Sequence, residues 1–172
     1  MGLDMFLNRN RDLNWEEIEE LKTKLPKAQY PIYGVKEEVA YWRKANQIHN
    51  FFMKNDVDGS DRIAKIEISD IKQLLEICKR LKRELRLETG QIHVGTKHSK
   101  NGVEEMYEEG KVIANPELAE ALLPTRAGFF FGSTDYDGYY YEQICDAIHT
   151  LQRIVDEHSR YENVSYEYVA SW

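Results

Sequence analysis

Apolar and polar positions alternate along three short stretches of the chain, and this pattern predicts strands. The alternation covers residues 3–7, 64–68 and 164–170, where every second side chain would face a core. Residues 128–132 read Gly-Phe-Phe-Phe-Gly, which is typical of a strand covered on both faces. The sequence therefore predicts four strands.

Other stretches repeat apolar residues every three or four positions, the spacing of a helix that packs one face against a core. Asn14 and Ser69 are good N-cap residues, and Asn115-Pro116 is a strong helix start. The predicted helices cover residues 15–24, 36–54, 118–123 and 139–159, with a long helix after Ser69 that carries apolar residues as far as Leu85.

These elements predict an α+β fold, with a small, mostly antiparallel four-stranded sheet packed with three to four helices. A chain of 172 residues fits a single domain over residues 1–172. Residues 88–115 are rich in Gly, Lys, Glu and His without a sustained period, so we expect a long loop or a mobile hairpin there.

The predicted helix over residues 36–54 sets polar groups within an apolar face. At helical spacing one stripe contains Val35, Val39, Trp42, Asn46, His49 and Met53, and Arg43 and Asn50 lie along its rim. Burying an unpartnered amide costs about 1–3 kcal/mol, so Asn46 and His49 should meet polar groups elsewhere in the fold or on a ligand. The sequence leaves both alternatives open.

A polar turn with Thr134, Asp135 and Tyr136 follows the phenylalanine run, where loops often carry function. The structural alternative is that Asp137 caps the last helix and Asp135 forms the turn. The functional one has this turn facing the 36–54 helix across a cleft. The candidate ligand- or partner-binding residues are then Trp42, Arg43, Asn46, His49, Asn50, Thr134, Asp135 and Tyr136.

The formal charge of -7 argues against direct binding of nucleic acid, which needs a concentrated basic surface. Cys78 and Cys145 fall within helical patterns and resemble core thiols of a reduced, cytoplasmic protein. No apolar run approaches 18 residues, so we expect no membrane span.

Two loop segments partly match ligand-binding motifs. Residues 56–67 have acidic or hydroxyl side chains at calcium-loop positions, but Asp61 stands where the loop needs glycine. His93 and His98, near two glutamates, could build a metal site or belong to an exposed polar loop. Lys97 is displaced by one residue from the lysine position of a phosphate loop. We therefore expect no metal and no cofactor.

Three segments carry long, distinctive motifs: residues 1–7 (MGLDMFL), 37–50 (EEVAYWRKANQIHN) and 122–137 (LLPTRAGFFFGSTDYD). Together they resemble a family of small proteins encoded by bacteriophages and prophages, over most of the chain except residues 8–34 and 88–115. Some members carry a phosphoglycerate kinase label, but this chain is far too short for a two-domain kinase. The resemblance implies a phage accessory protein in the host bacterial cytoplasm, and such proteins commonly counter a bacterial defence system or redirect a host enzyme.

The expected function is therefore a non-enzymatic, phage-type binding protein that inhibits or sequesters a host or defence protein. The alternative is a small enzyme or nucleotide-binding protein with a His/Asp/Arg pocket. In that alternative His49 acts as general base, Asp135 orients it and Arg43 holds an anion. Trp42 or Tyr136 would then stack on a ring of the ligand.

Overall fold

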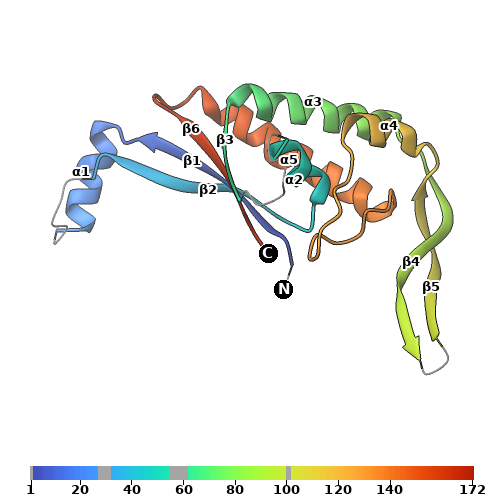
Figure 1. The fold of residues 1–172 in the computed structure, drawn as a ribbon. Coiled ribbons are helices and arrows are strands. Elements are labelled where there is room, and N and C mark those ends of the chain that lie inside the picture. Colours follow the sequence, from blue (N-terminus) through green and yellow to red (C-terminus); the bar gives the residue numbers. More distant parts are fainter. Residues whose placement is uncertain (1, 27–31, 55–61, 100–101) are drawn as a thin grey trace.

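Two antiparallel sheets and five helices make up the part of the chain that the computed structural model describes, residues 2–26, 32–54, 62–99 and 102–172. The predicted α+β class is confirmed (Figure 1). In chain order the elements are β1 (Asp4–Asp12), α1 (Trp15–Lys24), β2 (Gly34–Arg43), α2 (Asn46–Phe52), β3 (Ile63–Ile66), α3 (Ile68–Glu84), β4 (Leu87–Ser99), β5 (Gly102–Ile113), α4 (Pro116–Leu122), α5 (Gly138–His158) and β6 (Ser165–Ser171).

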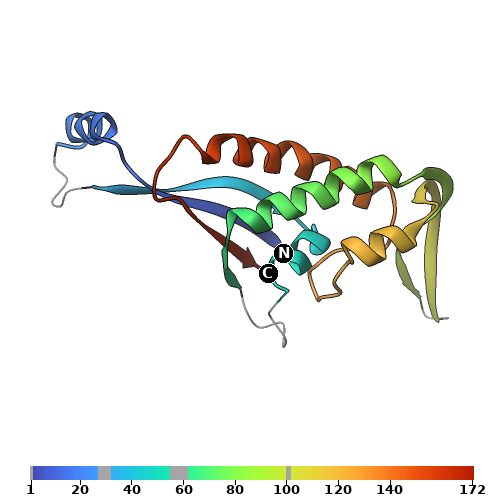
Figure 2. The same cartoon turned by 90° about the horizontal axis from the view of Figure 1, so that it is seen from above.

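The four-stranded sheet has the order β2-β1-β6-β3, with every neighbouring pair antiparallel. Both central strands alternate, since Met5 and Leu7 of β1 and Tyr166 and Tyr168 of β6 are buried while the residues between them are partly exposed. The buried face lies under α3 and α5, which cross above the sheet side by side (Figures 1 and 2). None of the described helices lies on the opposite face.

The helices form where the apolar spacing predicts them, except in the second segment. The predicted N-cap at Ser69 is wrong, because α3 begins at Ile68 and Glu67 and Asp70 form its capping box. α3 buries a stripe from Ile71 to Leu81, and α5 buries a matching stripe from Tyr140 to Ile154. Asn14 caps α1 by accepting a hydrogen bond from the Glu17 amide at 2.9 Å. Asp137 likewise caps α5, as the structural alternative for the 133–137 turn expected.

The prediction of a helix over residues 36–54 is wrong for its first half, because residues 34–43 form β2. The pairing with β1 shifts at Leu7/Asn8, so that Ala40 and Glu38 face successive β1 residues and Val39 is the extra residue of a bulge. This bulge changes the alternation of buried residues in β2. The apolar positions 35, 39 and 42 therefore have helical spacing and continue in phase into the true helix α2.

The prediction of a strand at Gly128–Gly132 is also wrong, because this segment is a turn. The Phe131 amide donates to the Gly128 carbonyl at 3.2 Å, and Gly132 has a φ of 90°, a left-handed conformation that favours glycine. Phe131 is buried, whereas Phe129 is 87% exposed. Phe131 thus packs inward, whereas the rings of Phe129 and Phe130 contact each other outside the core, with centroids 4.5 Å apart.

β4 and β5 pair with each other as a long hairpin. For this region the sequence predicted either a long loop or a hairpin. The hairpin projects away from the helices and the four-stranded sheet, and only its base lies near α4 and α5 (Figures 1 and 2). Residues 56–61 of the calcium-like segment lie outside the described residues, and the following residues 63–66 form β3.

A network of charged side chains connects the far ends of β1 and β2 to α1 and α5. Arg9 is 5% exposed and donates to Glu37 at 2.7 Å and to Glu157 at 3.0 Å. Arg11 bonds both Glu17 and Glu37, and both guanidinium groups lie over the ring of Tyr161. Burial acts to raise the pKa of Glu37, but the hydrogen bonds from Arg11 and Arg9 outweigh it and hold that pKa below its usual value.

Candidate interaction surface

Asn46 is the residue that joins the two segments in which the sequence places a site. Its side chain is 1% exposed, at the start of α2. The amide nitrogen donates to the carbonyls of Phe131 at 3.2 Å and Ser133 at 2.7 Å, and the amide oxygen accepts from the Arg126 amide at 3.1 Å. Both ends of the amide therefore have protein partners. Of the two alternatives, the structure favours the internal network for Asn46.

His49 lies one helical turn later and is also 1% exposed. Its Nδ1 is 2.8 Å from the hydroxyl oxygen of Tyr168 in β6, and its ring contacts the rings of Phe131 and Trp172 edge-on. Burial raises the pKa of Tyr168, so its hydroxyl stays protonated and can donate to His49. A general base must reach its substrate, and the burial of His49 argues against that role.

The other predicted residues of the second segment are divided between core and surface. Trp42 is buried in β2 against Phe52. Asn50 is half-buried and donates to the Pro124 carbonyl at 3.1 Å. Arg43 is exposed at the end of β2, 4.0 Å from Asp4. The predicted single face of Trp42, Arg43, Asn46, His49 and Asn50 is therefore not an exposed surface, because its central residues pack inward.

The polar turn after the phenylalanine run is held by its own hydrogen bonds. The Ser133 hydroxyl donates to the Asp135 carboxylate at 2.8 Å and accepts from the Asp135 amide at 3.0 Å. The Thr134 carbonyl accepts from the Thr125 hydroxyl, and the Tyr136 hydroxyl accepts from the Thr125 amide. Asp135 is exposed while His49 is buried, so the geometry does not support them as an acid–base pair.

Asp135 and Tyr136 do line an open cleft of about 360 Å³ between this turn and the hairpin. The hairpin contributes Glu105, Tyr107 and His93, and the His93 ring pairs with the Glu105 carboxylate. Within the described ranges, no group of three or more His, Cys, Asp or Glu side chains is arranged to hold a metal ion. In the same ranges, no helix has the length and apolar character that a bilayer crossing requires.

An apolar row lies on the uncovered face of the four-stranded sheet, and the sequence pattern did not predict it. The pairing register aligns one residue from each strand across the sheet: Tyr41 in β2, Phe6 in β1, Val169 in β6 and Ile63 in β3. Ile63 is 61% exposed and Tyr41 is 49% exposed. Neighbouring strands are about 4.8 Å apart, so the row extends for about 14 Å.

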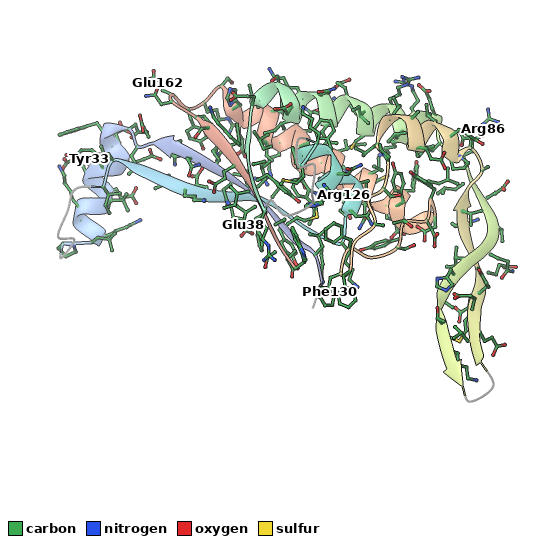
Figure 3. The ribbon with its side chains drawn as sticks, viewed as in Figure 1. Tyr33, Glu38, Arg86, Arg126, Phe130 and Glu162 are labelled. Atoms are coloured by element: carbon green, nitrogen blue, oxygen red, sulfur yellow. The ribbon has the colours of Figure 1, made fainter. Side chains whose placement is uncertain are left out.

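Polar residues frame this row on both sides. Asp4 and Arg43 lie on one side, and the Tyr41 hydroxyl donates to the Asp4 carboxylate at 2.6 Å. The register aligns the other side across all four strands as Glu38, Asn8, Glu167 and Lys65. Glu38 projects from this face, and Phe130 lies on the same side of the molecule, away from α3 and α5 (Figure 3). We call the apolar row and this frame the open face.

The sequence does contain a sign of the open face, namely apolar residues at strand positions that point away from the core. Phe6 and Val169 alternate with the core residues of β1 and β6, so they must point away from the core. Apolar side chains at outward positions of adjacent strands indicate a contact surface. The signal could not be combined across strands because strand order and register are not readable from the sequence.

Comparison of the chain with protein-family models, with curated protein sequences and with solved structures finds no significant match.

Proposed function

We propose that the chain is a phage-type accessory protein that binds a host or defence protein through the open face and thereby inhibits or sequesters it. The observation that carries this proposal is the apolar row across all four strands of a sheet face that no described helix covers. The phage origin comes from the resemblance of the three sequence motifs.

The composition of the open face supports a protein as the partner. Protein interfaces combine an apolar, often aromatic centre with a polar rim, and tyrosine, phenylalanine and arginine are common in them. The row supplies Tyr41 and Phe6, whose rings are 5.3 Å apart, and the frame supplies Arg43. An open sheet surface of this kind suits a protein better than a small ligand, which binds in a concave site.

The alternative of a small enzyme or nucleotide-binding protein has less support. Its general base would be His49, which is buried against Tyr168, and its anion-binding group would be Arg43, which lies by Asp4 at the end of β2. These groups do not line one cleft with Asp135, whose cleft is formed with the hairpin instead.

Affinity purification from a bacterial host tests the proposal with three matched chains. The open-face variant is Tyr41→Ser with Ile63→Glu, and the control is Tyr33→Ser with Trp15→Glu, which changes two comparably exposed residues near α1. Native mass spectrometry should find a stoichiometric protein with the wild type and the control, and lose it with the open-face variant. Equal urea midpoints would show that the variants fold.

Two results would contradict the proposal. In one, all three chains retain the same partner. In the other, denaturing mass spectrometry finds a small nucleotide released from the wild-type chain, which would favour the alternative.

A further inference from the structure

Both edges of the four-stranded sheet carry features that hinder pairing with another chain. In the edge strand β2, the Val39 carbonyl accepts from Arg153 at 2.6 Å and the Arg43 carbonyl accepts from Gln143 at 3.4 Å. The other edge strand, β3, has only four residues. Capped carbonyls and short edge strands are devices by which proteins block the addition of further strands.

The two outer edges of the hairpin differ in regularity. β4 carries a bulge at Val94, between His93 and Gly95, which interrupts its regular backbone. β5 pairs without an extra residue along its whole length from Gly102 to Ile113. The outer edge of β5 is therefore the long, regular edge among the strands that the structure describes.

The base of β5 already pairs with an extended segment on that outer side. Val112 forms an antiparallel bridge with Asp137, and the Ile113 amide donates to the Tyr136 carbonyl at 3.0 Å. The edge thus accepts a backbone partner at its C-terminal end. Farther along β5, over residues 103–110, the described chain supplies no strand on this side, although Glu105 and Tyr107 border the cleft that Asp135 and Tyr136 line. The far end of the hairpin projects away from the helices and the four-stranded sheet (Figures 1 and 2).

The side chains of this edge define what could pair with it. Residues 104–109 read Glu-Glu-Met-Tyr-Glu-Glu, which puts two carboxylates on each face of the ribbon with an apolar residue between them. Glu104 faces Lys97 across the hairpin and Glu105 pairs with His93, whereas Glu108 and Glu109 face Ile92 and Gln91. The edge is acidic on both faces.

A second copy of the chain fits this edge poorly. Antiparallel pairing of two β5 edges centred on Met106 and Tyr107 would put glutamates of the two copies opposite one another. Like charges directly opposite are destabilising in a sheet. The same carboxylates favour a strand with basic residues at those positions.

We propose that the outer edge of β5 binds an extended, lysine- or arginine-rich segment of a protein partner by strand addition. The register requires two basic residues, two apolar residues and two basic residues in succession, so that each lies opposite its counterpart in residues 104–109. Backbone hydrogen bonds supply the pairing and the carboxylates select the sequence. The inference rests on the proposed function in one respect only, that the partner is a protein. The surface involved is the edge of β5 and not the open face.

A synthetic peptide tests the inference on the full-length chain. The probe is Thr-Lys-Lys-Val-Val-Lys-Lys-Thr with blocked ends, followed through amide chemical shifts of ¹⁵N-labelled protein. We expect the largest shifts at residues 103–110. Replacing Glu104, Glu105, Glu108 and Glu109 by Gln should weaken binding at least tenfold. A control with Gln at the exposed positions 16, 117, 120 and 162 removes the same charge and should bind within twofold of the wild type.

Backbone methylation separates strand addition from charge attraction. Alternate amides of an added strand point toward the edge, so N-methylation of one alternate set of peptide residues should abolish binding while methylation of the other set leaves it. Three results would overturn the inference. They are equal binding of both methylated peptides, an equal loss of affinity in both Gln variants, and no binding at millimolar concentrations of the peptide. The Tyr41→Ser/Ile63→Glu variant should bind the peptide normally, so this inference and the proposed function can fail separately.

Discussion

The side-chain amide of Asn46 donates to the carbonyl oxygen of Ser133 at 2.7 Å, across 87 residues of sequence. This bond fastens the start of α2 to the turn that follows the three phenylalanines. The two segments that the sequence proposes as one site are therefore neighbours in space. They meet through a buried hydrogen-bond network and not across a cleft, which makes Asn46 a structural residue.

Replacement of Asn46 by Ala should destabilise the fold by about 1–3 kcal/mol, because the carbonyls of Phe131 and Ser133 and the Arg126 amide each lose a bond that Asn46 supplies. Urea denaturation measures the change in the free energy of unfolding. Asn50→Ala is the control, since it removes one bond from a half-buried position and should cost about 1 kcal/mol or less. Equal stability of Asn46→Ala and the wild type would contradict the role assigned to Asn46.

The Arg9–Glu37 network predicts a dependence of stability on pH. Because the pKa of Glu37 is lowered in the folded chain, its ionised form stabilises the fold above its usual pKa of 4.5, and this contribution is lost as the pH falls through the lowered value. Glu37→Gln should cost about 1–3 kcal/mol at pH 7, and the difference from the wild type should shrink toward pH 3. Urea midpoints across this range provide the measurement.

Glu38→Gln is the matched control for the Glu37 variant, since Glu38 is the next residue of β2 and lies in the frame of the open face. Its effect on stability should stay within about 0.5 kcal/mol, as for most surface substitutions. A Glu37→Gln difference that does not change between pH 7 and pH 3 would count against the ion-pair explanation.

Replacing Gly132, at the end of the phenylalanine turn, by a residue with a side chain should destabilise the fold. Its φ of 90° is strained for residues with a Cβ, and that Cβ would lie 3.1 Å from the Cβ of Lys44. Gly132→Ala should therefore lower stability by about 1 kcal/mol or more. Thermal unfolding checks this, with Gly138→Ala as a comparison at a glycine without positive φ, whose added Cβ would lie at a similar distance, 3.0 Å, from the Cβ of Lys111. A Gly132→Ala chain as stable as Gly138→Ala would refute the assignment.

The regular elements were predictable wherever one periodicity holds along a whole segment. α3 and α5 keep helical spacing throughout, and β6 and the first half of β1 alternate strictly between apolar core residues and outward residues. The second half of β1, residues 8–12, is polar throughout and was not predicted as a strand. β2 was not predictable, since its bulge at Val39 gives strand residues helical spacing. The spacing of apolar residues indicates which residues are buried. A bulge changes that spacing locally, so a strand can show the spacing of a helix.

The candidate site was predictable only in part, for a different reason. The sequence shows that Asn46 and His49 need polar partners, and the structure supplies Ser133 and Tyr168 from distant segments. Whether such partners come from the fold or from a ligand depends on long-range packing, which a local pattern does not contain. The open face depends on strand register in the same way.

The two cysteines should react differently in the folded chain, and this provides a probe of the α3–α5 packing. Cys78 is fully buried in α3, and burial raises the pKa of its thiol to about 12, whereas Cys145 in α5 is partly exposed. Iodoacetamide at pH 8 should therefore modify Cys145 in the native protein and reach Cys78 only when the chain unfolds. Peptide mass spectrometry locates the label. In a Cys145→Ser variant, the labelling rate of the remaining thiol should rise with urea along the unfolding transition. Rapid labelling of Cys78 without denaturant would mean that the contact between α3 and α5 opens far more readily than this packing allows.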